Sequence, residues 1–242
     1  HLDLRIYFCV PCYICKMKLR LIAKKRQVSS IKSFVFKPKA NITWTAGQYL
    51  IYSLSHKNAD LRGEMRFFTI SSSPFQKHIT ITTRIFKTAS SFKKTLDNLK
   101  IGDEIEVKGP DGDFTFDNPK KLSVFIAGGI GITPFISIIR QLNFENKPIN
   151  ITLLYASKTK SIAFKNELEE IAKNHKEFKI RFVLFPKRID EKVLSKFTKN
   201  KKTVFFVSGP DPMVDSVTKI LLDLGVLEDN IKQDYFSGYK KI

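Results

Sequence analysis

The sequence predicts a two-domain protein, in which a small antiparallel β-barrel with one helix precedes an α/β domain built on a parallel sheet. Short runs of alternating or β-branched residues recur through residues 18–108, at the spacing typical of a barrel. After Asn118 and Pro119, strand-like runs alternate with helical patterns, which indicates parallel strands joined by crossover helices. A chain of 242 residues with 43% hydrophobic content suits two domains, expected here at 17–118 and 119–242.

The barrel domain is expected to hold six strands and one helix. The strands are Lys18–Ala23, Ile31–Phe36, Tyr49–Leu54, Arg66–Ile70, Ile79–Ile85 and Glu104–Lys108. The helix is expected over Ser91–Leu99, where apolar residues fall on one face and Ser90 or Ser91 provides an N-cap. Gly109–Phe114 is expected to form a tight turn that closes the barrel.

The second domain is expected to alternate strands with helices. The strands are Leu122–Ala127, Ile151–Tyr155, Ile180–Leu184, Val204–Ser208 and Ile231–Asp234. The helices are Pro134–Leu142, Ile162–Asn174, Glu191–Phe197 and Met213–Leu224.

A glycine-rich turn, Gly128–Gly131, follows the first strand of the second domain. Thr133 is expected as the N-cap of the next helix and Pro134 as its first residue. Such a turn lets a diphosphate approach main-chain N–H groups at the positive end of a helix. The alternative is an ordinary αβ turn, which glycines also punctuate.

The formal net charge is +19, from 42 Lys and Arg against 23 Asp and Glu. Such a charge attracts nucleotides, acidic proteins, nucleic acid or lipid headgroups, and does not choose among them. The lysines are spread along the chain without an RNA-binding signature, so a solvated basic surface is the simpler interpretation and no nucleic-acid partner is expected.

The three cysteines, Cys9, Cys12 and Cys15, lie in one CxxCxxC run. Iron–sulfur clusters normally need four protein ligands and the sequence has no fourth cysteine, so no metal site is expected. A disulfide framework is not expected either, which favours the cytoplasm or the cytoplasmic face of a membrane.

Residues 1–16 are expected to be an upstream extension or the stub of a longer protein. The apolar segment Ile6–Cys15 is shorter than the roughly 20 residues that cross a bilayer. Met17 directly precedes a strand-like run. Membrane association is therefore expected only if these residues belong to an anchor.

Three further motifs carry candidate chemistry. Arg66–Thr69 offers a forked guanidinium for phosphate, an aromatic ring and a hydroxyl, although it also reads as an ordinary strand end. Ser90–Phe92 begins a helix whose N–H groups can accept a phosphate oxygen, or is simply a capped amphipathic helix. Ser208–Met213 follows a buried strand, at the sheet edge where open α/β sheets bind ligands.

The order of Arg66–Thr69, Gly109–Phe114, Gly128–Pro134 and Ser208–Met213 resembles the ferredoxin reductase superfamily of flavin and nicotinamide nucleotide oxidoreductases, over roughly residues 17–242. The resemblance implies a flavin-binding barrel followed by a nucleotide-binding domain. Arg66 would hold the flavin phosphates, while Phe68, where the family more often has Tyr, would pack on the isoalloxazine.

The same resemblance assigns the remaining site residues. Thr69 would face flavin N5 and Ser208 would lie beside the nicotinamide, as the two catalytic residues. Phe236, or after it Tyr239, would place an aromatic ring near the flavin. The residues expected to bind the cofactors are Arg66, Phe67, Phe68, Thr69, Ser90, Ser91, Phe92, Gly128, Gly129, Gly131, Ile132, Thr133, Pro134, Ser157, Lys158, Gly209, Pro210, Met213 and Phe236.

The expected function is hydride transfer from NADPH or NADH to bound FAD, with FMN less favoured, and onward electron transfer. Ser157, Lys158 and Lys160 favour NADPH over NADH, unless they are ordinary surface. The expected acceptor is an acidic electron carrier or an oxygenase-type partner. The alternatives are a nucleotide-sensing or electron-entry subunit without turnover, and the reductase domain of a membrane oxidoreductase.

Overall fold

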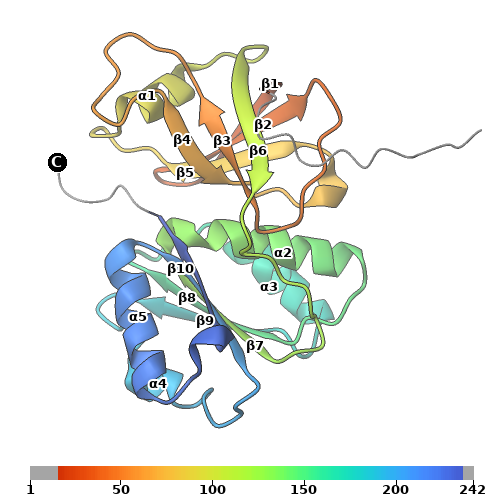
Figure 1. Ribbon diagram of the computed structural model, residues 1–242, viewed down its shortest axis with the longest axis vertical. Helices are drawn as coiled ribbons and strands as arrows, with labels where there is room; N and C mark the ends of the chain where they lie inside the picture. The colour runs from red at the N-terminus through yellow and green to blue at the C-terminus, as the bar shows by residue number, and fades with distance from the viewer. Residues whose placement is uncertain (1–15, 237–242) are drawn as a thin grey trace, which may run out of the picture.

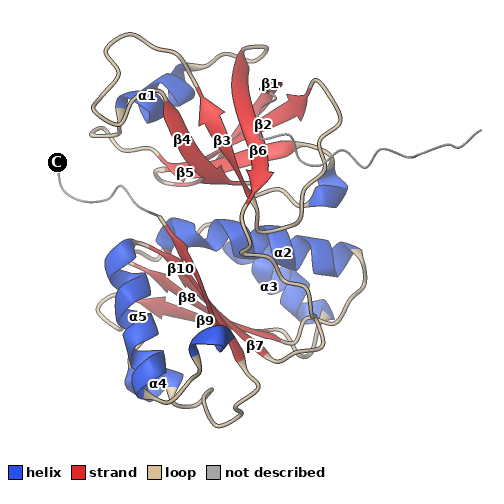
Figure 2. Cartoon of the chain, in the orientation of Figure 1, coloured by secondary structure: helices blue, strands red, loops and turns tan. Residues whose placement is uncertain are grey.

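The computed structural model describes residues 16–236 and consists of a barrel above an α/β domain (Figure 1). The three cysteines of the expected N-terminal extension, and Tyr239, lie outside the described residues. Figure 2 shows strands filling the upper body, and a strand layer flanked by helices in the lower one. The predicted fold class is confirmed.

The barrel domain is one antiparallel sheet of six strands, ordered β4-β3-β6-β1-β2-β5. The strands are β1 (Met17–Val28), β2 (Ile31–Pro38), β3 (Tyr49–Ser53), β4 (Met65–Thr69), β5 (Ile79–Arg84) and β6 (Glu104–Asp111). Alternate residues of these strands point into one apolar core, which explains the period-two pattern of the sequence. Helix α1 (Ser91–Asn98) adds Phe92 and Leu96 to that core.

The prediction of a tight turn at Gly109–Phe114 is wrong for the first half of that segment. Strand β6 continues through Asp111, which pairs with Tyr49 of β3 across an irregularity in register. Gly109 has a φ of +106°, a conformation that glycine adopts without steric cost. A bulge at this glycine therefore replaces the first half of the turn, and the strand extends toward the second domain.

The second domain is a parallel sheet ordered β11-β10-β7-β8-β9. The strands are β7 (Ser123–Gly128), β8 (Ile151–Ser157), β9 (Lys179–Leu184), β10 (Val204–Gly209) and β11 (Ile231–Tyr235). Every residue of β7 and β10 is buried, as expected of central strands with both faces covered.

Helices cover both faces of this sheet (Figure 1). They are α2 (Ile132–Phe144) and α3 (Lys165–Asn174) on one face, and α4 (Glu191–Leu194) and α5 (Asp211–Asp223) on the other. Short 3₁₀ turns occur at Pro74–Gln76, Gly129–Gly131 and Glu228–Asn230. Helix α3 begins three residues later than predicted, because Phe164 adopts a φ of +61° and interrupts the helical path.

Helix α2 fastens the barrel to the α/β domain. The Ser137 hydroxyl donates to the Ser72 carbonyl at 2.7 Å, and the Arg140 guanidinium donates to the Ser71 carbonyl at 2.9 Å. The rings of Phe75 and Phe144 stack with centroids 4.2 Å apart. These contacts fix the orientation of the two domains.

No helix within residues 16–236 is long and apolar enough to cross a membrane. Over the same residues, no group of three or more His, Cys, Asp or Glu side chains is arranged to hold a metal ion.

Candidate active site

The glycine turn and the Ser208 turn meet at the carboxyl edge of the parallel sheet. Strand β7 lies between β8 and β10, so the chain leaves β7 toward β8 and later returns on its other side at β10. Open α/β sheets bind nucleotides in the crevice at such a switch point.

Glycines allow these two turns to pack directly on each other. A Cβ on Gly131 would lie 2.3 Å from the Ser208 carbonyl oxygen, and one on Gly128 would lie 2.3 Å from the Met213 sulfur. Neither glycine has a positive φ, in contrast to Gly129 at +55°. The sequence therefore places glycine at 128 and 131 for close packing, and at 129 for the turn itself.

The start of α2 differs from the prediction. The helix begins at Ile132 with Gly131 as its N-cap, so Thr133 and Pro134 are its second and third residues. The Thr133 hydroxyl donates to the Ile130 carbonyl at 3.2 Å inside the structure. The reason is the 3₁₀ turn at Gly129–Gly131, which already carries the chain into the helix.

A cavity of about 1140 Å³ opens beyond these turns. Seven of the predicted cofactor residues line it: Gly128, Gly129, Ser157, Lys158, Pro210, Met213 and Phe236. Gly131, Ile132, Thr133 and Pro134 are buried in the packing instead. Sequence reasoning missed several lining residues, among them Arg84, Phe185, Lys187, Arg188 and Asp211.

A simple signal identifies part of what was missed. Lys187 and Arg188 come shortly after the end of strand β9. In the same way, Ser157 is the last residue of strand β8 and Lys158 follows it. Both pairs therefore lie at the carboxyl edge, where a nucleotide is expected. The same rule applied to every strand would have named them.

Arg84 connects the barrel to this crevice. It ends strand β5, and a Cβ on Gly129 would lie 3.4 Å from its Nη2 atom. Its Nε is buried without a hydrogen-bond partner among the described residues. A buried N–H of this kind needs an acceptor, which an anionic ligand in the crevice can supply.

Tyr155 of strand β8 is hydrogen-bonded to the glycine turn. Its hydroxyl donates to the Gly129 carbonyl at 3.0 Å, and the ring is fully buried in strand β8. Burial raises the pKa of this phenol, so it remains a hydrogen-bond donor at any physiological pH.

Ser208, one of the two residues predicted to be catalytic, is fully buried. Its hydroxyl donates to the Asp234 carboxylate at 3.1 Å, because the two residues face each other on the parallel strands β10 and β11. Burial raises the pKa of Asp234 to about 6, and the hydrogen bond from Ser208 opposes part of that rise. Phe236, two residues after Asp234, donates its N–H to the Gly209 carbonyl and lines the cavity.

Arg66 lies on the barrel beside the start of α1. Its Nη2 donates to Asp60 at 2.9 Å, and its Nη1 donates to the carbonyls of Arg62 and Gly63 at 2.7 and 2.8 Å. The guanidinium also stands over the ring of Phe92, 5.4 Å from its centroid. The arginine is therefore oriented by both its loop and the helix.

The predicted aromatic residues occupy different environments. Phe68 is 9% exposed and lies between the rings of Tyr52 and Phe92 in the barrel core. Phe67 is 65% exposed and touches the ring of Tyr49 edge-on. Thr69, the other predicted catalytic residue, is 7% exposed at the end of β4. Strand alternation thus places Phe67, rather than Phe68, on the open face.

The start of α1 follows the prediction more closely. Ser90 is the N-cap, with its hydroxyl accepting from the Lys93 N–H at 3.3 Å. The Ser91 N–H donates to Asp60 at 3.1 Å. Burial, with the charges of Arg62, Arg84 and Arg66, lowers the pKa of Lys93 to about 8. The positive charge near the start of this helix is therefore high enough to act on Lys93.

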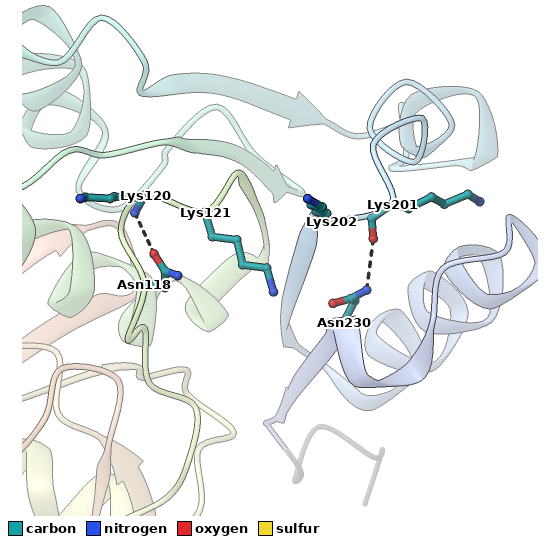
Figure 3. A pocket seen from close by; sticks show the side chains of 6 residues that line it. All are labelled: Asn118, Lys120, Lys121, Lys201, Lys202 and Asn230. Carbon is teal, nitrogen blue, oxygen red and sulfur yellow. Dashed lines mark hydrogen bonds between the residues drawn. The ribbon is translucent and has the colours of Figure 1, made fainter.

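A smaller pocket of about 440 Å³ lies at the opposite edge of the sheet (Figure 3). It is lined by Asn118, Lys120, Lys121, Lys201, Lys202 and Asn230. The two lysine pairs precede strands β7 and β10, whereas the glycine turn follows β7. The two pockets share no lining residue, so this pocket is separate from the crevice.

Comparison with known proteins agrees with this geometry. The family model of an oxidoreductase FAD-binding domain matches residues 18–116, and that of an oxidoreductase NAD-binding domain matches residues 125–219. The chain therefore belongs to the ferredoxin reductase-type oxidoreductases, which join an FAD-binding domain to an NAD-binding domain.

Among curated proteins, flavohemoprotein A of Dictyostelium discoideum is 28% identical over 235 residues, which cover 88% of this chain and 58% of that protein. NADH-cytochrome b5 reductase 1 of the same organism is 34% identical over 152 residues, or 56% of this chain and 52% of that protein. The chain thus spans little more than half the length of these relatives.

Solved structures share the fold over nearly the whole chain. The flavohem-like FAD/NAD-binding domain of nitric oxide dioxygenase from Vibrio cholerae aligns with a TM-score of 0.78 and 22% identity, covering 91% of this chain and 98% of that one. The cytochrome b5 reductase domain of Ulva prolifera nitrate reductase also gives 0.78 and 22%, covering 91% and 97%.

The residues of the chain fit both cofactors on independent grounds. On the barrel, the Arg66 guanidinium and the α1 N-terminus already bind a carboxylate, so they can bind a phosphate. In the crevice, the unpartnered Arg84 Nε and the glycine turn border a cavity of nucleotide dimensions.

Proposed function

We propose that this chain transfers a hydride from NADPH to bound FAD and passes the electrons singly to an acidic haem-protein or oxygenase-type partner. The observation that carries the proposal is the crevice itself: two turns from β7 and β10 frame one cavity, and Arg84 of the flavin barrel lines the same cavity. A nucleotide bound there would touch both domains. The flavin supplies the redox chemistry, since it accepts an electron pair and releases electrons one at a time.

On the barrel side, Arg66 and the N-terminal amides of α1 would bind the flavin diphosphate. The Arg66 fork suits two phosphate oxygens, and its Nη2 already donates to one carboxylate oxygen, of Asp60, at 2.9 Å. Phe67 offers the open ring face that stacking on the flavin requires, while Phe68 supports it from the core. Thr69, 7% exposed at the end of β4, would lie beside the flavin.

In the crevice, the main-chain N–H groups at Gly128–Ile130 and the Arg84 guanidinium would bind the nicotinamide nucleotide's diphosphate. The Ser208 hydroxyl would act as a positioning group that orients the Asp234 carboxyl, rather than by contact with the substrate. With a pKa of about 6, Asp234 is close to the range in which a carboxyl can hold or release a proton near neutral pH. Phe236 would close the crevice on its flavin side.

The preference for NADPH rests on charge at the carboxyl edge. An acid that would bind a ribose hydroxyl in an NAD site is replaced at the end of β8 by Ser157 and Lys158. Lys187 and Arg188 line the same cavity after β9. Three cations facing one cavity favour a 2′-phosphate.

The acceptor is inferred from the relatives and from charge. The relatives carry the names flavohemoprotein, cytochrome b5 reductase and, in Chromohalobacter salexigens, glycine betaine monooxygenase reductase subunit, at 31% identity over 62% of this chain and 39% of that one. A formal charge of +19 favours an acidic partner. The proposed location is the cytoplasm or the cytoplasmic face of a membrane.

The test is to purify the protein, identify the flavin that it releases, and add NADPH or NADH without oxygen. The flavin absorbance should bleach faster with NADPH, and an acidic haem protein added afterwards should be reduced more slowly as salt is raised. A colourless protein that binds no added flavin would overturn the proposal. A yellow protein bleached by neither nucleotide would indicate the electron-entry or sensing subunit instead.

A further inference from the structure

The Asp60 carboxylate is bound by the same two groups that fit a flavin phosphate. One of its oxygens accepts from Arg66 Nη2 at 2.9 Å and from the Arg62 N–H at 3.0 Å. The other accepts from the Ser91 N–H, at the first residue of α1, at 3.1 Å. A phosphate oxygen seeks this same combination of a guanidinium and a helix N-terminal amide.

The loop that carries Asp60 is held to α1 by a small set of polar contacts. The Asp60 N–H donates to the Ser91 hydroxyl at 2.9 Å, and the ring of His56 hydrogen-bonds the same hydroxyl at 2.9 Å. At the tip of the loop Leu61 is fully exposed, whereas the base of the loop is anchored by the buried Leu54 and by the His56 ring against Phe92. A loop tip attached mainly by polar contacts opens at a lower free-energy cost than a segment packed into the core.

The charge around Asp60 favours a stronger anion than one carboxylate. Two arginines form ion pairs with Asp60: Arg66 at 2.9 Å and Arg62 at 3.8 Å. Lys93, in the first turn of α1, has its pKa held well below its ordinary value by burial and by the charges of nearby arginines, Arg62 and Arg66 among them. Asp60 contributes one negative charge to this group. A diphosphate brings two, so it can replace the carboxylate with a net gain in attraction.

We propose that Asp60 is an internal competitor for the diphosphate site, which FAD must displace, so that this residue determines both flavin affinity and selection for phosphorylated flavins. The inference rests on the proposed function, in which Arg66 and the α1 N-terminus bind the diphosphate. Riboflavin has no phosphate and leaves Asp60 in place. FAD exchanges its phosphate for the carboxylate and then gains the full interaction with Arg66.

The test compares Asp60→Asn with Glu64→Gln in flavin-free protein. Glu64 belongs to the same loop, and its carboxylate accepts from Ser55 and from the His56 N–H. Among the described residues it forms no hydrogen bond or ion pair with Arg66 or α1. Dissociation constants for FAD and riboflavin are measured by flavin fluorescence. We expect D60N to bind FAD about tenfold more tightly, the effect of losing one charge-assisted competitor. Riboflavin affinity should not change, and E64Q should match the parent protein with both ligands.

Two results would overturn the inference. Weaker FAD binding by D60N would show that Asp60 orients Arg66 for the flavin and does not compete with it. Equal FAD affinity in D60N and the parent would show that the carboxylate and the phosphate occupy different positions.

Inorganic pyrophosphate separates this inference from the proposed function. If neither protein binds FAD, the proposed function fails, and thermal shift with pyrophosphate then decides the inference. A larger pyrophosphate-induced rise in melting temperature for D60N than for the parent supports an internal competitor. Equal rises contradict it.

Discussion

The two helix starts that we propose bind phosphates, those of α1 and α2, differ in what their polar groups contact. At the start of α1 the N–H of Ser91 and the Arg66 guanidinium are both satisfied by Asp60. At the glycine turn before α2, the neighbouring Arg84 Nε has no partner within residues 16–236 and a cavity of about 1140 Å³ lies open. The difference matches a resident cofactor, which binds once, against a substrate nucleotide that must enter and leave in every turnover.

The largest effect is expected at the barrel site alone. Arg66→Ala removes the guanidinium and should weaken FAD binding about a hundredfold, since several charge-assisted hydrogen bonds are lost together. Fluorescence titration of flavin-free protein measures it. Arg20→Ala is the control, because Arg20 is an exposed barrel arginine paired only with Glu104 among the residues described. If R66A and R20A bound FAD with equal affinity, the flavin diphosphate would not bind at Arg66.

A second change should break the crevice and leave the barrel intact. Gly131→Ala places a methyl group 2.3 Å from the Ser208 carbonyl, while the backbone at Gly131 has a φ of −61° that alanine adopts freely. The steric conflict should lower the free energy of unfolding by about 2 kcal/mol and raise KM for NADPH, with FAD still bound. Gly102→Ala is the control for KM: a Cβ there meets nothing within 4 Å, and its φ of +99° should cost stability at a barrel turn that does not line the crevice. An unchanged KM in G131A would show that the turns do not need this close approach.

The pH dependence of stability should report on Asp234. Its pKa is raised to about 6 from 3.8, so the folded state binds a proton more tightly than the unfolded state does. The contribution of Asp234 to the free energy of unfolding is therefore fully present below about pH 4 and is lost as the pH rises through about 6. Between these values the free energy of unfolding should fall by roughly 1 kcal/mol per pH unit. Asp234→Asn should flatten that part of the curve, measured by denaturant unfolding from pH 4 to 8. If the free energy of unfolding of the variant changed with pH as steeply as that of the parent, other groups would be responsible for the pH dependence.

The smallest effect is expected at the residue that joins the two sites. Arg84→Ala should weaken NADPH binding about tenfold, since one guanidinium facing the crevice is lost, and leave FAD in place. Lys187→Ala lines the same cavity farther from the barrel and should cost less. Equal losses in the two variants would mean that Arg84 acts only through the general positive charge of the crevice.

Much of the architecture could be predicted because it follows from periodicity. Alternation marked the barrel strands, continuous apolar runs marked β7 and β10, and the glycine turn marked the switch point between them. The bulge at Gly109 and the left-handed Phe164 were missed, because each depends on contacts that no local pattern records. The early start of α2 has the same origin, in a 3₁₀ turn that replaces the expected cap.

The site was only partly predictable for a related reason. Motifs identified the turns, but which of their atoms reach the cavity depends on how the two turns pack, so Thr133 and Ser208 came out buried. Arg84 comes from the other domain and enters the crevice only through the docking of the barrel on α2. Asp60 belongs to no motif, so its place in the site could not be predicted from the sequence and follows only from its contact with Arg66.

Single-turnover reduction of the flavin-loaded protein shows whether a hydride passes from the nucleotide in the crevice to the flavin. NADPH and NADPH deuterated at nicotinamide C4 are mixed with the protein without oxygen, and flavin absorbance is followed in time. Direct hydride transfer across the crevice predicts bleaching with both, and slower bleaching with the deuterated nucleotide. A flavin that stays oxidised with either nucleotide, although FAD is bound, would contradict the account.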